Sequence, residues 1–253
     1  EHEKVAAYLG VVTFVEHYGL HIHYIQYCGW PTELADRPEH FQDDFGVVWN
    51  RSGADKDIGV VDHPQIEDLE DYDYKFPKLN EQRLRKEYEE LIATKNGRFT
   101  IAGIGFSMFE RSWSLCGMEN ILASMLLCPE ELEGLYDAIC EYNLKVLDIA
   151  LEYDIDGVYF GDDWGQQKGL IMGPEHWRRF LKPRIKRMYE KAKSHGKFVI
   201  QHSCGDIGEL FGDLIDIGLD CYQTVQPEIY DMEKIKREYG KDLSFWGGIS
   251  TQR

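Results

Sequence analysis

The sequence predicts an α/β fold built on a parallel sheet or barrel. From about Gly97 onward, short apolar runs alternate with amphipathic segments of helical period. The runs are nearly continuous in apolar residues, as expected for parallel strands buried on both faces. This strand–helix–strand order implies right-handed crossovers. The length of 253 residues suits a single domain, because an α/β barrel needs about 250 residues. We therefore predict one domain over residues 1–253.

Five runs meet the description of a buried strand. They are Phe99–Ser107, Gly157–Asp163, Phe198–Cys204, Leu219–Val225 and Leu243–Gly247. Helices are expected between them over Pro129–Tyr153, 174–194, Leu210–Ile215 and Met232–Tyr239. Pro129 suits a first helical turn, and Pro183 should kink or divide the second helix. Asp206 can cap the third helix, and Gly218 can end it.

The first part of the chain follows a different pattern. Residues 1–97 are expected to form an N-terminal excursion and helices, and 98–253 the barrel strands and helices. Residues 50–80 have the composition of a long irregular excursion with a hairpin near 51–55, and 81–96 have that of a surface helix. The chain lacks an initial Met and stops directly after a strand-like segment. We therefore expect a barrel truncated at both ends, from a protein of roughly 330 to 380 residues.

Composition excludes several classes of partner. Asp and Glu number 45 against 28 Lys and Arg, which gives a formal net charge of -17. This balance argues against nucleic acid and anionic membranes, since both select basic surfaces. No apolar run approaches the roughly 18 residues of a spanning helix, and no signal peptide is visible. Six scattered cysteines lack the spacing of a disulfide scaffold, so we expect a cytoplasmic protein.

Polar residues follow the predicted strands at their carboxyl ends, where α/β folds bind ligands. The residues expected to contact substrate are Phe106, Glu110, Trp164, Gln166, Gln167, Gln226 and Trp246. Asp162 and Asp163 are candidates for substrate orientation or proton transfer, because adjacent carboxylates repel and seek a cation, a donor or solvent. The alternative for these two residues is helix capping and loop solvation. His17, His21 and His23 have the pattern of ordinary surface or loop residues.

His202 and Cys204 form the sharpest motif. Residues two apart in an extended segment project to the same side, so imidazole and thiolate would converge. Together these ligands suit Zn²⁺. Glu228, at the end of the next predicted strand, is a candidate catalytic residue and oxygen ligand, whereas Cys221 lies near the start of that strand. The alternative is a hydrogen-bonded histidine beside a buried cysteine.

At these residues the sequence resembles the uroporphyrinogen decarboxylase superfamily, and within it the corrinoid-linked methyltransferase branch. The most specific likeness is His202–Gly205 with Gly218–Asp220 and Gln226–Glu228. Further segments are Glu3–Gly10, Phe45–Val47, His63–Pro64 and Phe245–Gly248. The resemblance implies an eight-stranded TIM-type (β/α) barrel. The Arg-Gln-Ala-Gly-Arg stretch of the true decarboxylases is absent, and those enzymes lack His-Ser-Cys-Gly at this position.

What the resemblance implies for function is zinc-dependent methyl transfer. His202 and Cys204 would be zinc ligands, a third ligand would be a Cys beyond Arg253, and Glu228 could approach the metal. The partners would be a small methyl donor or acceptor and a separate corrinoid carrier protein bearing methylcobamide. Two other hypotheses stay open: a metal-free decarboxylase of a porphyrinogen or smaller acid, and a non-catalytic barrel that only binds a ligand.

Overall fold

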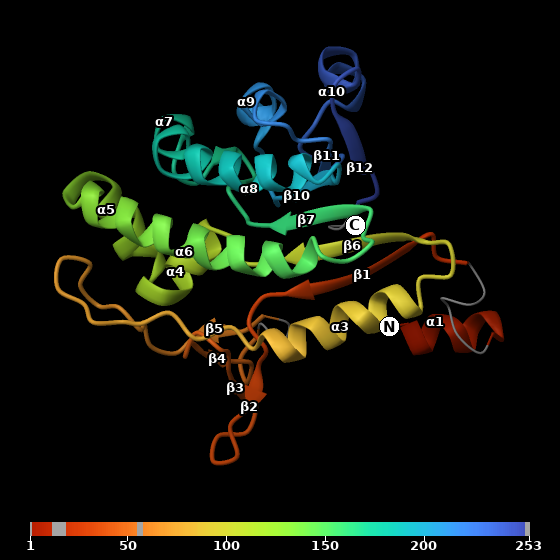
Figure 1. Ribbon diagram of the computed structural model, residues 1–253. Coiled ribbons are helices and arrows are strands. Elements are labelled where there is room, and N and C mark those ends of the chain that lie inside the picture. Colours follow the sequence, from red (N-terminus) through yellow and green to blue (C-terminus); the bar gives the residue numbers. More distant parts are fainter. Residues whose placement is uncertain (1, 12–18, 55–57, 251–253) are drawn as a thin grey trace.

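A computed structural model describes residues 2–11, 19–54 and 58–250. Its centre is a sheet of six parallel strands whose spatial order equals their order along the chain. The strands are β1 (Ile22–Tyr27), β6 (Phe99–Ile104), β7 (Gly157–Gly161), β10 (Phe198–His202), β11 (Cys221–Val225) and β12 (Ser244–Gly247). All five predicted strands are therefore confirmed. The arrangement is that of a partial TIM-type barrel (Figure 1).

Helices connect the strands, as the sequence predicts. The expected helices appear as α6 (Pro129–Ala150), α7 (Pro174–His176), η1 (Trp177–Leu181), α8 (Lys182–Ser194), η2 (Gly208–Leu210), α9 (Phe211–Asp216) and α10 (Met232–Tyr239). Pro183 stands in the first turn of α8, directly after the π-helical turn η1, so the long run is divided as predicted. Two helices were not anticipated, α4 (Phe109–Cys116) and α5 (Met118–Leu127).

The sheet begins earlier in the chain than predicted, at β1. This strand pairs with β6, Ile22 opposite Phe99 and Tyr27 opposite Ile104. Its sequence mixes Ile and Tyr with His and Gln, so it contains no continuous apolar run. The reason is its position at the sheet edge, where Tyr24 is 62% exposed. Residues 1–97 thus also supply a strand of the barrel sheet.

The rest of the N-terminal region forms a separate layer below the sheet in Figure 1. Four short strands pair antiparallel: β2 (Thr32–Glu33), β3 (His40–Gln42), β4 (Val48–Asn50) and β5 (Val60–Val61). The pairing of β4 with β5 agrees with the predicted hairpin, whose residues 55–57 lie outside the description. Helices α1 (His2–Leu9) and α3 (Glu81–Ala93) complete this region, and α3 is the expected surface helix.

Strand alternation decides which side chains reach the barrel interior. Val158 and Phe160 of β7 are wholly buried in the core, and Tyr159 between them faces the opposite side of the sheet. Ile200 and His202 lie on that inner face opposite Tyr159 and Gly161 of β7. The inner face therefore leads to His202 at its carboxyl edge. No helix among the described residues is long and apolar enough to cross a membrane.

Candidate metal centre at the carboxyl ends of the strands

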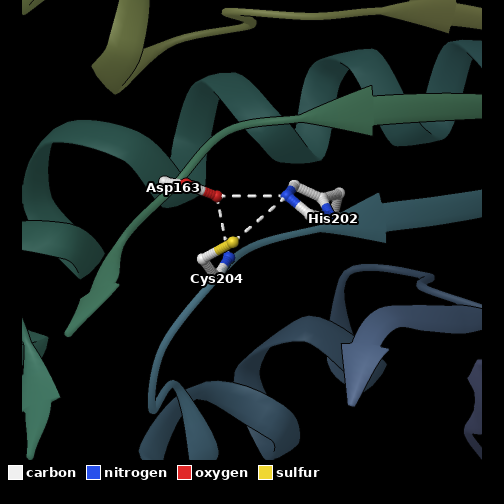
Figure 2. A group of neighbouring side chains, drawn as sticks. All are labelled: Asp163, His202 and Cys204. Carbon is white, nitrogen blue, oxygen red and sulfur yellow. Dashed lines mark hydrogen bonds and ion pairs between the residues drawn. The ribbon is translucent and has the colours of Figure 1, made fainter. Parts of the chain in front are cut away.

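Asp163, His202 and Cys204 converge just beyond the ends of β7 and β10 (Figure 2). Their candidate ligand atoms all lie within 4.8 Å of one another. His202 Nε2 is 3.3 Å from Asp163 Oδ1 and 3.6 Å from Cys204 Sγ. The main-chain N–H of Cys204 donates to Asp163 Oδ1 at 2.7 Å. The structure thus brings together the His-x-Cys pair and one carboxylate of the neighbouring strand end.

The chemistry of this donor set suits zinc. Zn²⁺ accepts imidazole nitrogen, thiolate sulfur and carboxylate oxygen, and catalytic sites combine three protein ligands with one open position. Asp163, His202 and Cys204 offer one atom of each kind. All three are partly buried, so the centre is reachable from the barrel mouth. The residues present therefore fit the metal that the sequence motif implies.

Hydrogen bonds and a close backbone approach hold the loop after β7 against the loop after β10. Ser203 Oγ accepts a hydrogen bond from the N–H of Trp164 at 2.9 Å, and the N–H of Asp206 donates to the carbonyl of Gln166 at 2.8 Å. A Cβ on Gly205 would lie 2.2 Å from the carbonyl carbon of Gly165, and Gly205 has φ +76. Both glycines are required for this approach, which fixes Asp163 beside Cys204.

The orientation of His202 is set from the adjacent strand β11. Gln223 Oε1 lies in hydrogen-bond contact with His202 Nδ1 and also accepts from the Tyr159 hydroxyl at 3.2 Å. An acceptor at Nδ1 places the ring proton there and leaves Nε2 free to face the cluster. Neither Gln223 nor Tyr159 was among the sequence candidates. The alternation of side chains along β7 and β11 places both residues on the inner face, and this alternation is the sequence signal that could have identified them.

The side chains of the cluster shift one another's pKa values. For Asp163, burial favours the neutral acid, but hydrogen bonds from His202 and from the Cys204 N–H outweigh it and lower the pKa. For His202, burial opposes the charge, but contacts with Asp163 and Cys204 raise the pKa to about 10. Asp163 and His202 therefore form an ion pair, in which each partner stabilises the charge of the other.

The two neighbouring aspartates occupy different environments. Asp162 is wholly buried and accepts hydrogen bonds from the N–H groups of residues 108–110, at 2.8 to 3.2 Å, and from the Trp164 indole. These are the contacts of a residue that anchors the start of α4. The prediction of a catalytic role for Asp162 stays a prediction.

Glu110, in the first turn of α4, has a raised pKa. Burial raises the pKa of Glu110, and the nearby charges of Asp162 and Asp163 raise it further.

The remaining candidates are spread over the barrel mouth and its surroundings. Trp164 is wholly buried against Trp177, with ring centroids 5.3 Å apart. Gln226 is buried and accepts from the Gly205 N–H at 3.0 Å, so it supports the loop of the cluster. Three candidates are exposed and outside the cluster: Gln166 and Gln167 on the hairpin of β8 (Gly165–Gln166) and β9 (Gly169–Leu170), and Glu228 on the turn after β11.

Two aromatic candidates line cavities. Trp246 of β12 lies opposite Gln223 and borders a small cavity of 130 Å³ on the inner face. Phe106, directly after β6, borders a second cavity of 170 Å³.

The histidines near the start of the chain lie apart from the cluster. His23 Nε2 is 2.9 Å from the Thr94 hydroxyl in an exposed contact, and His21 is exposed. His17 lies outside the described residues.

Comparison with known proteins adds a family and a fold. The model of the uroporphyrinogen decarboxylase family matches residues 53–253. A search of curated protein sequences finds no match. Among solved structures, a methyltransferase from Methanosarcina mazei superposes with a TM-score of 0.67 at 19% identity, covering 91% of this chain. The chain spans 65% of that structure's length. At this identity the likeness shows the barrel fold.

Proposed function

The chain belongs to the uroporphyrinogen decarboxylase family, and from that premise we propose that it is a zinc-dependent methyltransferase. It would move a methyl group between a small O-, N- or S-methylated substrate and a corrinoid protein or thiol acceptor. The observation that carries this proposal is the convergence of Asp163, His202 and Cys204 at the barrel mouth. The fold likeness to a solved methyltransferase is consistent with it.

In this proposal Asp163, His202 and Cys204 hold the zinc ion. When bound, zinc supplies Lewis acidity toward the heteroatom that carries the methyl group. Asp163 thus takes a ligand role in addition to the substrate role that the sequence suggested for it. Three protein ligands leave one position for the substrate. The sequence-based expectation of a third ligand from a cysteine beyond Arg253, with Glu228 as a possible ligand, stays a prediction.

The surrounding residues position the ligands and the substrate. Gln223 and Tyr159 hold the His202 ring so that Nε2 points at the metal position. Glu110 lies in the first turn of α4, close enough to Asp163 that the charge of Asp163 raises its pKa. Its carboxyl group is placed to orient a substrate at the open position. The other methyl carrier would be the cobamide of a separate corrinoid protein docked at the barrel mouth, as cob(I)amide when it accepts the methyl group and as methylcobamide when it donates it.

Methyl transfer to free cobalamin tests the proposal directly. The zinc-loaded protein is incubated with cob(I)alamin and a panel of methyl ethers, methylamines and methyl thiols, and methylcobalamin is followed by its absorbance. We expect methylcobalamin from at least one donor and its loss in Cys204→Ala, with Cys221→Ala as the matched cysteine control. Product formation that is equal in wild type and Cys204→Ala would contradict the proposal.

A decarboxylase is the second candidate, because the matching family is described by that activity. It predicts release of carbon dioxide from uroporphyrinogen without added metal. The His202–Cys204 pair and the net charge of -17 both disfavour it, since a tetrapyrrole with many carboxylates is poorly matched to an acidic protein. Anaerobic incubation with uroporphyrinogen and no carbon dioxide release would eliminate this candidate.

A further inference from the structure

Three glycines leave a stretch of bare backbone on the inner face of the sheet, next to the metal cluster. Gly103 lies in β6, Gly105 directly follows that strand, and Gly161 ends β7 beside them. A Cβ on Gly161 would lie only 3.5 Å from the Gly105 Cα, so the two backbones are in close contact. The interior of a TIM barrel is otherwise filled by layers of bulky side chains. This glycine floor (Gly103, Gly105 and Gly161) therefore leaves room for a side chain from another strand.

The side chain that lies on the glycine floor is that of Gln26, from β1. Tyr24 and Gln26 are two apart on this strand and both border the small cavity of 130 Å³ on the inner face. A Cβ on Gly105 would lie 2.3 Å from Gln26 Nε2, and a Cβ on Gly103 would lie 3.2 Å from Gln26 Cγ. Gly105 thus leaves the space that the Gln26 amide occupies, and Gly103 leaves space for its aliphatic part.

The Gln26 amide reaches the level of His202. A Cβ on Gly161 would lie 3.6 Å from Gln26 Nε2, and Gly161 is the residue opposite His202 in the pairing of β7 with β10. Neighbouring strands are about 4.8 Å apart, so the amide is roughly one strand spacing from β10. Asp163 follows Gly161 by two residues. The amide therefore lies in the barrel mouth beside the position that the metal ligands surround.

The small cavity combines aromatic rings with side-chain amides. The described residues that line it are Tyr24, Gln26, Ile101, Tyr159, Gln223 and Trp246. The Gln223 side-chain oxygen is engaged by His202 and by the Tyr159 hydroxyl. Gln26 is exposed, and the cavity is partly open, so its amide is within reach of a ligand. Whichever way the amide is turned, it offers two N–H donors and one acceptor oxygen.

We propose that Gln26 is a specificity-determining residue whose carboxamide hydrogen-bonds a hydroxyl or carbonyl oxygen of the substrate. The inference deepens the proposed function and rests on it: the heteroatom of the substrate takes the open metal position, and a second polar group a few bonds away meets Gln26. The aromatic rings of the cavity pack against the carbon atoms between the two groups. The site therefore selects a bifunctional substrate over methanol, methylamine or dimethyl sulfide, which carry one polar atom only.

Calorimetric titration of the zinc-loaded protein with two pairs of thiols tests the inference. The first pair is 2-mercaptoethanol and 1-propanethiol, and the second is 3-mercapto-1-propanol and 1-butanethiol. Within a pair the sulfur and the chain length are the same, and only a terminal hydroxyl is exchanged for a methyl group. The quantity compared is the ratio of the Kd of the alkyl thiol to the Kd of the hydroxy thiol, because it cancels the contribution of the zinc–sulfur bond.

Replacing Gln26 should lower this ratio. In Gln26→Leu we expect the ratio to fall at least about threefold in at least one of the two pairs, which is the size of one net hydrogen bond. Gln82→Leu, at an exposed glutamine of α3, is the matched control and should keep the wild-type ratio in both pairs. A change smaller than about threefold in both pairs of Gln26→Leu would overturn the inference.

Gly105→Ala tests the glycine floor while Gln26 itself is retained. The added methyl group would occupy the place of Gln26 Nε2, so the amide must move and the ratio should fall as it does in Gln26→Leu. Gly212→Ala in α9, where a Cβ meets nothing within 4 Å, is the matched glycine control. A wild-type ratio in Gly105→Ala would show that the glycine floor does not position the amide, and would overturn the inference.

These outcomes separate the two proposals. Thiols that bind the zinc-loaded protein with one and the same ratio in wild type and Gln26→Leu defeat only the inference about Gln26. Failure of all four thiols to bind the zinc-loaded protein defeats the proposed function, since the metal would then have no position open to a substrate, and the inference falls with it.

Discussion

His202 presents Nε2 to the cluster because its other ring nitrogen is held by Gln223. Gln223 Oε1 also accepts a hydrogen bond from the Tyr159 hydroxyl, and this contact holds the side-chain oxygen of Gln223 toward His202. Partners of this kind fix the tautomer and the ring plane of a metal-binding histidine. The three residues come from β7, β10 and β11, whose inner faces meet at this level.

Replacing Gln223 tests this positioning role. Gln223→Leu removes the acceptor at Nδ1, so we expect zinc affinity to fall about 10- to 100-fold. Competition with a fluorescent zinc chelator measures the change. Gln167→Leu, at an exposed glutamine of the β8–β9 hairpin, is the control and should bind zinc as wild type does. Equal zinc affinity in Gln223→Leu and wild type would show that the orientation of His202 does not depend on Gln223.

The sequence predicted the His202–Cys204 pair but not the residue that joins it. Spacing by two places both side chains on one side of an extended segment, and this reasoning needs no tertiary information. Which of Asp162 and Asp163 faces the mouth depends on the register of β7 against α4 and β10. The structure turns Asp162 under α4 and Asp163 toward His202. Two adjacent aspartates in the sequence do not by themselves show which one is buried under the helix and which one faces the cluster.

Helix α4 begins at Phe109, and its N-cap residue, Met108, makes no side-chain capping hydrogen bond. Its free N–H groups are satisfied instead by Asp162, from the neighbouring strand end. A carboxylate at this position also complements the positive end of the helix dipole. The helix was missed in the sequence because its cap is distant in the chain. This contact ties the position of Glu110, in the first turn of α4, to the loop that carries Asp163.

Removing the Asp162 carboxylate should destabilise the protein strongly. In Asp162→Ala four buried donors lose their acceptor, and each orphaned group costs about 1 to 3 kcal/mol. We expect the free energy of unfolding to fall by at least about 3 kcal/mol in urea denaturation. Asp154→Ala, which removes an exposed partner of Lys95, should cost less than about 1 kcal/mol. Similar costs for the two variants would rule out the anchoring role.

The close approach of Gly165 and Gly205 is a second contact that holds the loops after β7 and β10 together. Gly205→Ala would place a Cβ 2.2 Å from the Gly165 carbonyl carbon at a residue with φ +76. We expect a loss of stability above about 2 kcal/mol from strain and clash together, with loss of zinc binding. Gly134→Ala, where a Cβ in α6 meets nothing within 4 Å, should instead stabilise by up to about 1 kcal/mol. Thermal unfolding with and without zinc distinguishes these outcomes.

At the scale of the molecule, apolar runs and helical period predicted the interior strands and most crossover helices. Those strands are buried on both faces, so their sequences carry the signal directly. The edge strand β1 is half exposed and its pattern is mixed, and so its membership of the sheet depends on pairing with β6. The position of Gln26 over Gly105 could not be foreseen, because it depends on the same pairing.

The metal content of the protein tests the central claim most directly. After equilibration with zinc and removal of free metal, we expect about one zinc per chain by elemental analysis. Asp163→Ala, His202→Ala and Cys204→Ala should each lose it, and Cys221→Ala, on β11 outside the cluster, should retain it. Wild-type protein without zinc, or full zinc content in all three cluster variants, would contradict a metal centre at Asp163, His202 and Cys204.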